Sequence, residues 1–293
     1  MSKPTLAKSV TTILDKSGIQ EGGLTHEKSG VHVLRYETTR SQDMTVYHPL
    51  LCLVLQGEKE VKTGARTFKV KAGDSLIVSH TIPVVSSITK ASNKRPYMAL
   101  VFTLDLDILR SLGGSLGGAR GSSSPSSFSI TVSATDLDMQ DALSRLLYQS
   151  QNEDTQQILV PITRQEIHAR LLLGSHSETL RKMLWHENTA NRIHQATQNI
   201  REHLSQDLII SELAERVGMS KSAFFEQFKS ITGTSPLQYQ KELRLLQARD
   251  WLRSSGDKVS DVAFRIGYES SAQFSREYSR KFGVSPKSDR QFS

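Results

Sequence analysis

Arg276 follows Ser271, Ala272 and Ser275 at spacings that place all four side chains on one face of a helix. Its guanidinium group is a planar fork of N–H donors that can bond two acceptors at once, and the small neighbours allow close approach to a flat polar surface. The O6 and N7 atoms of guanine are such a pair of acceptors, and one bidentate contact discriminates between bases by about 1–3 kcal/mol. The spacing therefore predicts a helix that can read base edges in a DNA groove, with Arg280 one turn further along.

A second segment, about 50 residues earlier, has a comparable outward face. Its members are Lys221, Ser222, Phe225, Glu226 and Lys229. Glu226 can accept a hydrogen bond from the cytosine amine, and Phe225 can contact a thymine methyl group. An outward-facing phenylalanine is equally typical of a residue that completes a small core, so both interpretations of Phe225 stay open.

The two faces belong to an internal repeat with the pattern of a helix-turn-helix. Each copy is predicted to be a short helix, a turn that opens with glycine, and a second helix: Ser211–Val217 before Ser220–Thr232, and Val259–Ile266 before Ser270–Phe282. Glycine after the first helix permits a left-handed backbone, and the serine that follows can cap the second helix.

The segment between the copies, Leu237–Arg253, has Leu245, Ala248 and Leu252 at helical spacing and is predicted to be one helix. Such a helix is about 25 Å long. We expect it to hold the two reading helices near one turn of DNA apart, about 34 Å, so that both enter successive major grooves on one side of the duplex.

Residues 190–293 resemble the AraC/XylS-type DNA-binding domain of transcription regulators. The resemblance is carried by ISELAERVGMSKSAFFEQFKSITGTSP, RLLQARDWL and VSDVAFRIGYESSAQFSREYSRKFGVSP, which appear in the order and spacing of that family. At the end of the domain the family commonly has Pro-x-x-aromatic-Arg, where this chain has Pro286 to Arg290 with Asp289 in place of the aromatic residue. We expect this departure to affect only the last packing contact.

The first half of the chain has short apolar runs separated by turns, which is typical of an antiparallel β-sandwich or small barrel. The runs are Val31–Tyr36, Leu50–Leu55, Arg66–Val70, Ser75–Val78, Val84–Ile88 and Met98–Leu104. Gly64 and Gly73 mark two hairpin corners, because glycine readily adopts the positive φ of such turns. Glycine and serine dominate residues 113–129, so we expect a flexible loop there. Further on, Met139, Leu143 and Leu146 indicate a helix, and Pro161 can open another that ends near Gly174.

This half is similar to the N-terminal domain of one branch of the AraC family, through LVLQGEKEVKTGARTFKVKAGDSLIVSHTIPV and PITRQEIHARLLLGS. The resemblance implies a cupin-like β-barrel that senses a small molecule, followed by helices that mediate dimerisation. The expected fold is therefore α+β in two domains. It comprises a sensor at 10–112, a loop at 113–129, a helical dimerisation region at 130–188 and an all-α double helix-turn-helix at 189–293.

Inward-facing strand positions of a small barrel can enclose a ligand, which makes six residues candidates for effector binding. They are Arg35, Tyr36, Tyr47, His48, Cys52 and His80. Each is also consistent with an ordinary sheet or surface position. Four residues separate His48 from Cys52, so a histidinium could activate the thiol toward electrophiles, although a lone cysteine in an apolar run is commonly inert.

A metal-dependent cupin enzyme fused to a DNA-binding tail is the alternative hypothesis, and an architectural DNA-binding protein without sensing is a third. Against the enzyme, His32, His48 and His80 form no closely spaced His-x-His pair with a following Glu. We therefore expect no catalysis, no metal and no cofactor. A single cysteine excludes internal disulfides and cysteine zinc fingers.

The chain carries 37 basic and 30 acidic residues, a net charge of +7, which is compatible with a polyanionic partner. Lysines and arginines of the second half are either phosphate contacts or parts of a solvated face: Arg244, Arg249, Arg253, Arg280, Lys281 and Lys287. No stretch approaches the length of a membrane span, and no apolar segment follows Lys3 and Lys8 as in a secretory signal. We expect a cytoplasmic, nucleoid-associated regulator that acts as a homodimer on double-stranded DNA, answers a small-molecule effector and contacts RNA polymerase.

Overall fold

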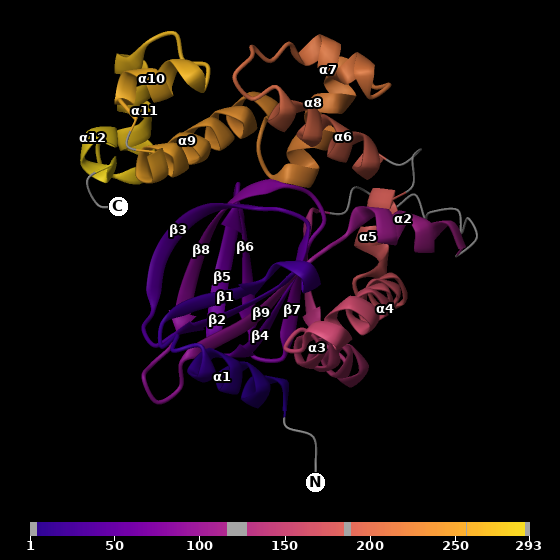
Figure 1. Cartoon of the computed structure of the whole chain (residues 1–293). Coiled ribbons are helices and arrows are strands. Elements are labelled where there is room, and N and C mark those ends of the chain that lie inside the picture. The colour runs from indigo at the N-terminus through magenta and orange to yellow at the C-terminus, as the bar shows by residue number, and fades with distance from the viewer. Residues whose placement is uncertain (1–4, 116–127, 185–188, 256, 291–293) are drawn as a thin grey trace.

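The computed structural model describes residues 5–115, 128–184, 189–255 and 257–290. A β-sandwich flanked by helices forms the N-terminal part, and an all-helical part lies across one end of it (Figure 1). The strands are β1 (Gly22–His26), β2 (Val31–Tyr36), β3 (Arg40–Tyr47), β4 (Leu50–Gln56), β5 (Glu58–Thr63), β6 (Arg66–Lys71), β7 (Asp74–Val78), β8 (Ile82–Lys90), β9 (Tyr97–Thr103) and β10 (Ile130–Ala134). The α+β class is confirmed.

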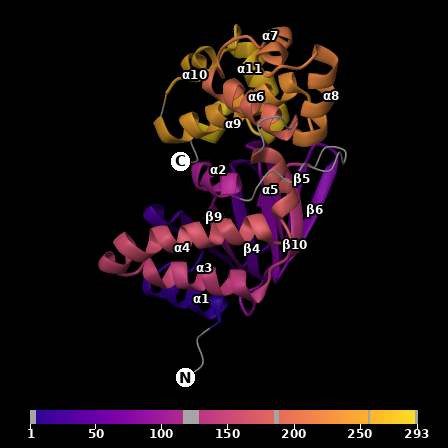
Figure 2. The same ribbon diagram turned by 90° about the vertical axis from the view of Figure 1, so that its right-hand side faces the viewer.

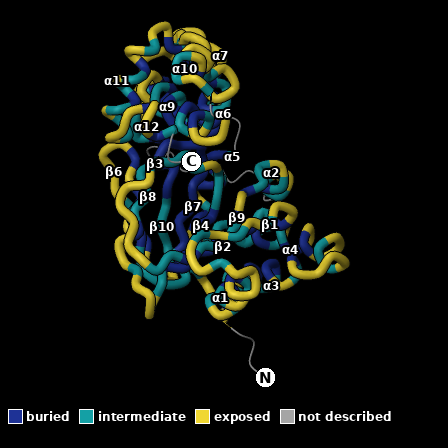
Figure 3. Tube along the Cα trace, turned by 60° about the vertical axis from the view of Figure 1, so that its left-hand side comes forward, coloured by how far each residue is buried: buried dark blue, intermediate teal, exposed yellow. Residues whose placement is uncertain are grey.

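The strands form two antiparallel sheets, one in the order β1-β2-β9-β4-β7-β10 and one in the order β3-β8-β5-β6. No ladder joins the two sheets among the described residues, so they form an open sandwich and the expected closed barrel is wrong. The six-stranded sheet is mostly buried, whereas β3 carries exposed residues (Figure 3). Strand alternation assigns each side chain to one of two cores. In β4, Cys52 and Val54 face the space between the sheets, and Leu51 and Leu53 face the helices outside.

Helices cover the outer face of the six-stranded sheet (Figure 2). They are α1 (Leu6–Lys16), α3 (Leu137–Gln149), α4 (Glu153–Leu173) and α5 (Ser177–Leu184), and α2 (Leu106–Ser115) packs against α4 and α5. The prediction that Pro161 opens a helix is wrong. Asn152 caps α4 by accepting hydrogen bonds from the backbone N–H groups of Asp154 and Thr155, and Pro161 lies inside the helix. The predicted end near Gly174 is confirmed.

The sheet extends beyond the domain boundary expected at residue 112. Strand β10 pairs with β7 from Ile130↔Val78 to Ala134↔Asp74, so the expected helical region at 130–188 begins with a strand. Its short run, Ile130 to Ala134, directly follows a segment rich in glycine and serine, which hides it from pattern reading. Most of the loop expected at 113–129 lies outside the described residues.

Both predicted helix-turn-helix units are confirmed. The first consists of α7 (Ile210–Arg216) and α8 (Lys221–Thr232), and the second of α10 (Val259–Arg265) and α11 (Ser271–Phe282). Gly218 and Gly267 adopt φ of 65° and 93°, the left-handed turn that the pattern requires. Ser220 and Ser270 cap the second helices by accepting from the backbone N–H groups three residues on. Helix α6 (Thr189–Glu202) precedes the first unit, and α9 (Pro236–Ser255) joins the two.

The end of the chain is held by a buried carboxylate where the family has an aromatic residue. Asp289, in α12 (Pro286–Asp289), is 3% exposed. It accepts hydrogen bonds from Tyr278 Oη at 2.7 Å, Arg249 Nε at 2.8 Å and Arg253 Nη2 at 2.7 Å. A polar cluster therefore joins α9, α11 and α12 in place of aromatic packing.

Asp289→Ala is expected to destabilise the second helix-turn-helix unit, because it leaves two guanidinium groups without their carboxylate. Breaking a buried ion pair by removing one partner costs about 3–5 kcal/mol. Urea denaturation followed by circular dichroism measures the loss in the free energy of unfolding. Asp257→Ala is the control. It breaks the pair with Arg265, in which both side chains are more exposed than that of Asp289, and is expected to change the free energy of unfolding little. Equal effects of the two substitutions would contradict this assignment.

Candidate nucleic-acid interface and ligand cavity

The predicted reading faces of α8 and α11 are open to solvent in the structure. In α8, Lys221, Ser222, Phe225, Glu226 and Lys229 are all exposed. Phe225 is 43% exposed, so it does not complete a core in this chain. The opposite face of α8 packs inward through Phe224, Phe228 and Ile231, as the spacing predicts.

Helix α11 presents a mixture of exposed and half-buried polar groups. Ala272, Arg276 and Arg280 are exposed, whereas Ser271 and Ser275 are half-buried and Ser275 Oγ donates to the carbonyl of Ser271 at 2.8 Å. Neither reading face is covered by the sandwich. Helix α9 runs between the two units and places them at its two ends (Figure 1).

Three of the arginines considered as phosphate contacts bind protein groups instead. Arg249 and Arg253 pair with Asp289. Arg244 donates to the carbonyl oxygens of Leu204, Gln206 and Gly267. These guanidinium groups hold the helices together, whereas the charges predicted on the reading faces of α8 and α11 are exposed.

The first helix-turn-helix unit is fixed to the end of the sandwich. Ser129 donates to the carbonyl oxygen of Ile231 through its N–H at 3.1 Å and through its hydroxyl at 2.6 Å. Thr63 Oγ1 donates to the carbonyl of Thr232 at 3.2 Å. The tip of the β5–β6 hairpin therefore lies against the C-terminal end of α8.

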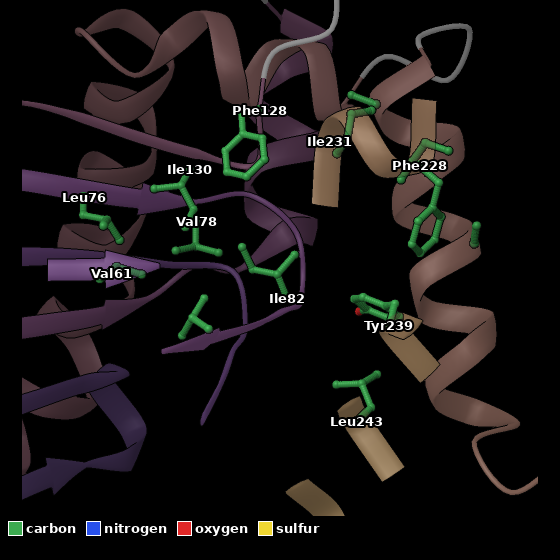
Figure 4. Packing of buried hydrophobic residues seen from close by; sticks show 14 of the residues in the cluster. Val61, Leu76, Val78, Ile82, Phe128, Ile130, Phe228, Ile231, Tyr239 and Leu243 are labelled. Carbon is green, nitrogen blue, oxygen red and sulfur yellow. The ribbon is translucent and has the colours of Figure 1, made fainter. Parts of the chain in front are cut away.

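The same contact continues along α6 and α9. Tyr239 Oη donates to the carbonyl of Thr81 at 2.5 Å, and Arg201 donates to the hydroxyl of Thr81 at 3.2 Å. His80 Nε2 lies 2.8 Å from the carbonyl oxygen of Ala190. Figure 4 shows the apolar part of this contact, in which side chains of the sandwich face those of α8 and α9. One hydrophobic cluster thus contains residues of both parts of the chain.

A cavity of about 380 Å³ lies between the two sheets, lined by β2, β3, β4, β5, β8 and β9. Lys59, 6% exposed, projects into it from β5, with its Nζ 2.8 Å from Tyr47 Oη and 3.8 Å from Cys52 Sγ. Burial lowers the pKa of Lys59, whereas Cys52 and the phenols of Tyr47 and Tyr97 raise it, and the net pKa lies well above the ordinary value. Tyr97, at 2% exposure, completes this polar end of the cavity.

Three of the six effector candidates line this cavity and three do not. Tyr36, Tyr47 and Cys52 lie there. Arg35 does not, because strand alternation turns it to the other face of the sheet, where it pairs with Asp15 and donates to backbone carbonyls after α1. His80 is buried in the contact with α6.

His48 lines a second hollow of about 360 Å³ together with Arg201 of α6 and Asp250 of α9. It precedes β4 instead of lying in it, so it does not face Cys52 as the spacing suggested. The neighbour of the thiol is Lys59, which the sequence reasoning missed. The signal was present in the alternation of β5, since Lys59 shares the inward face with Val61 and Thr63.

The histidines considered for a metal site are dispersed. Burial lowers the pKa of His80 to about 4 although its bond to Ala190 raises it, and burial with nearby positive charge lowers the pKa of His194 to about 3. The described part of the chain contains no group of three or more His, Cys, Asp or Glu side chains placed to hold a metal ion.

Comparison with known proteins places this architecture in one class, regulators that join a sensor-type N-terminal domain to a helix-turn-helix domain. The family model of the AraC-type transcriptional regulator N-terminus matches residues 28–179, and a helix-turn-helix model matches residues 213–291. The first match covers more than half of the chain. The chain belongs to the AraC-type transcriptional regulators, whose helix-turn-helix domain is the DNA-binding module.

Curated relatives match over part of their length. The HTH-type transcriptional activator RhaS of Escherichia coli is 33% identical over 129 residues, which are 44% of this chain and 46% of the relative. The matched segment thus spans about half of that relative.

Solved structures show the same two-part fold. An apo variant of ToxT from Vibrio cholerae aligns over 92% of this chain and 98% of its own, with a TM-score of 0.59 at 11% identity. Wild-type ToxT with bound unsaturated fatty acid aligns over 89% of this chain and 93% of its own, with a TM-score of 0.54 at 10% identity. Within the described residues, no helix has both the length and the apolar character of a membrane span.

Gly64→Ala is expected to loosen the contact between the hairpin and α8. A Cβ at Gly64, whose φ is +55°, would lie 2.0 Å from the carbonyl oxygen of Gly233. Gly73→Ala is the matched control, because its φ of +91° is equally unfavourable for alanine but its Cβ would meet nothing within 4 Å. Hydrogen exchange is expected to rise at residues 231–234 in Gly64→Ala alone. The same increase in Gly73→Ala would show that turn strain, and not the contact, is responsible.

Proposed function

We propose that the protein is a sequence-specific DNA-binding transcription regulator whose activity is set by a small molecule bound in the N-terminal domain. The observation that supports it most directly is the pair of capped helices, α8 and α11, with their polar faces exposed at the two ends of α9. Two such faces can enter successive major grooves of one duplex. The site of action in this proposal is the bacterial-type nucleoid in the cytoplasm, with RNA polymerase as a further partner.

A ligand in the sandwich can influence only the equilibrium between arrangements for which it has different affinities. The route is the hydrophobic cluster that contains Cys52 and Tyr97 at the cavity, Val61 further along β5, and Phe228 and Ile231 on α8. Repacking at the cavity would shift the surface on which α8 rests. The second unit has a separate core and follows through α9. In this scheme the ligand changes how the first reading helix is held relative to the second.

DNase footprinting of the purified chain on the DNA that flanks its own coding region tests the proposal. The expected result is one or more protected sites, each with two contacts about one helical turn apart. Specific regulators bind their sites about 10³–10⁷ times more tightly than random DNA. A ratio close to one at fixed salt would favour the architectural alternative and contradict sequence-specific regulation.

Arg276→Ala is expected to relax base choice at one position of the site, because the exposed guanidinium is lost without disturbing the core. The loss corresponds to about 1–3 kcal/mol of discrimination at that base pair. Binding-site selection with randomised DNA, performed on wild type and variant, measures it. Lys287→Ala removes an exposed charge outside the predicted reading face and serves as control, expected to leave the preference unchanged. Unaltered preference in Arg276→Ala would remove this residue from the interface.

We propose further that the chain forms a homodimer through α4. Ile158 and Ile162, 67% and 61% exposed, are one turn apart on this helix, and Leu159 beside them is 39% exposed. In a two-fold symmetric dimer the same surface of each copy packs on that of the other, so these three side chains would pack on their counterparts in the second copy. The family resemblance of this helical region to a dimerisation element supports the same occupant.

The combined change Ile158→Glu and Ile162→Glu is expected to give a monomer, because four carboxylates would face one another across the two-fold axis. Sedimentation equilibrium gives the mass. Gln157→Glu adds charge to the exposed side of the same helix and is expected to leave the dimer intact. A wild-type chain that is monomeric at micromolar concentration would refute the proposed dimer.

A further inference from the structure

The ammonium group of Lys59 lies in the sandwich without a carboxylate partner among the described residues. Its neighbours are the Tyr47 hydroxyl and the Cys52 thiol. The acidic residue that lines the same cavity, Asp43, is exposed at its edge and forms no ion pair with Lys59. The ammonium has lost its hydration, and no carboxylate among the described residues replaces it, so its partners are the Tyr47 hydroxyl and the Cys52 thiol.

Tyr97 adds a second unsatisfied donor at the same end of the cavity. Its hydroxyl is buried and has no hydrogen-bond partner in the described structure. Native proteins satisfy the large majority of such groups. Lys59 and Tyr97 thus offer two donors at one end of the cavity, one of them charged. Leu34, Val46 and Val101 give the lining an apolar part, and polar side chains such as Arg40, Thr45 and Ser86 share it.

We propose that this cavity binds a small monocarboxylate with an apolar body, its carboxylate held by Lys59 and Tyr97. This inference rests on the proposed function and specifies the chemical class of the effector. A carboxylate oxygen accepts hydrogen bonds from an ammonium and a phenol, and its negative charge gives the Lys59 ammonium an ionic partner. A cavity of about 380 Å³ accommodates a ring or a short alkyl chain behind that group.

Strand β5 connects this site to the DNA-reading part of the chain. Lys59 lies near one end of the strand, and Thr63 at the other end bonds to the carbonyl of Thr232 in α8. The two residues are about 13 Å apart along an extended strand. A carboxylate that draws Lys59 toward itself therefore acts on the strand whose tip supports α8.

The test compares benzoate and hexanoate with the neutral amides benzamide and hexanamide in thermal denaturation of the full chain. At least one acid is expected to raise the Tm of the wild type, while its amide, which has the same shape without the charge, has a smaller effect. The gain in Tm should disappear in Lys59→Met. In Tyr97→Phe the apparent affinity for the acid should fall about tenfold. Lys62→Met, on the outer face of the same strand, is the control and should respond like the wild type.

The unliganded variants provide a second readout. A cation kept for a ligand costs stability, so Lys59→Met is expected to raise the Tm without ligand and Tyr97→Phe to leave it equal or higher. A lower Tm in both would assign the two residues to the core and overturn the inference. Absence of any acid-specific gain in the wild type would overturn it as well.

Footprinting separates this inference from the proposed function. Specific protection of DNA without any response to the acids refutes only the carboxylate site. If an acid raises the Tm through Lys59 but the chain protects no specific DNA site, the proposed regulatory function is refuted and the carboxylate site still stands.

Discussion

The contact between the β5–β6 hairpin and the end of α8 is the constraint on which the arrangement of this chain depends. A Cβ at Gly64 would lie 2.0 Å from the carbonyl oxygen of Gly233, and one at Gly233 would lie 3.1 Å from that of Thr63, while both glycines have positive φ. Backbone carbonyls of Ile231 and Thr232, which a helix end leaves without intrahelical partners, are satisfied by Ser129 and Thr63 of the sandwich. The β-sandwich thus completes the hydrogen bonding at the end of α8, and the two cannot separate without leaving these groups to water.

This contact makes the two reading units unequal. The packing face of α8 belongs to the cluster that fills the sandwich, whereas Phe274 and Tyr278 of α11 belong to a separate core closed by Asp289. Helix α9 belongs to both, with Tyr239 in the first cluster and Leu252 in the second. The sandwich therefore packs directly against α8, whereas α11 is connected to it through α9.

Much of the recognition module could be predicted because its determinants are local. Capping serines, left-handed glycines and the spacing of Phe224 and Phe228 act within a few residues of each other, and the structure has each of them as expected. Six strands were found for the same reason. Pro161 does not mark the start of its helix, because Asn152, nine residues earlier, caps the helix with its side chain.

The ligand cavity could be predicted only in part, because its members come from strands far apart in sequence. Tyr36 and Tyr47 line the cavity, whereas Arg35 faces the other side of the sheet. The pairing of β2 with β9 decides which residues of β2 face inward, and the sequence of β2 alone does not show that register. Asp289 is a comparable case. Its polar cluster depends on two arginines of α9, which lie about 40 residues away and read as phosphate contacts in isolation.

Lys59 places a buried charged group at the cavity between the sheets. Inward-facing positions of β5 further along, at Val61, pack against neighbours that continue to α8, so apolar filling there serves the contact between domains. At Lys59 the ammonium nitrogen lies over the Tyr47 ring, 5.1 Å from its centroid, and places a charged group beside the hydrophobic cluster. A methionine of similar length would pack there at lower cost, since it needs no hydrogen bonds. The cation thus lies at one end of β5 while the other end of the strand supports α8, so an anion that paired with Lys59 would bind on the strand that contacts α8.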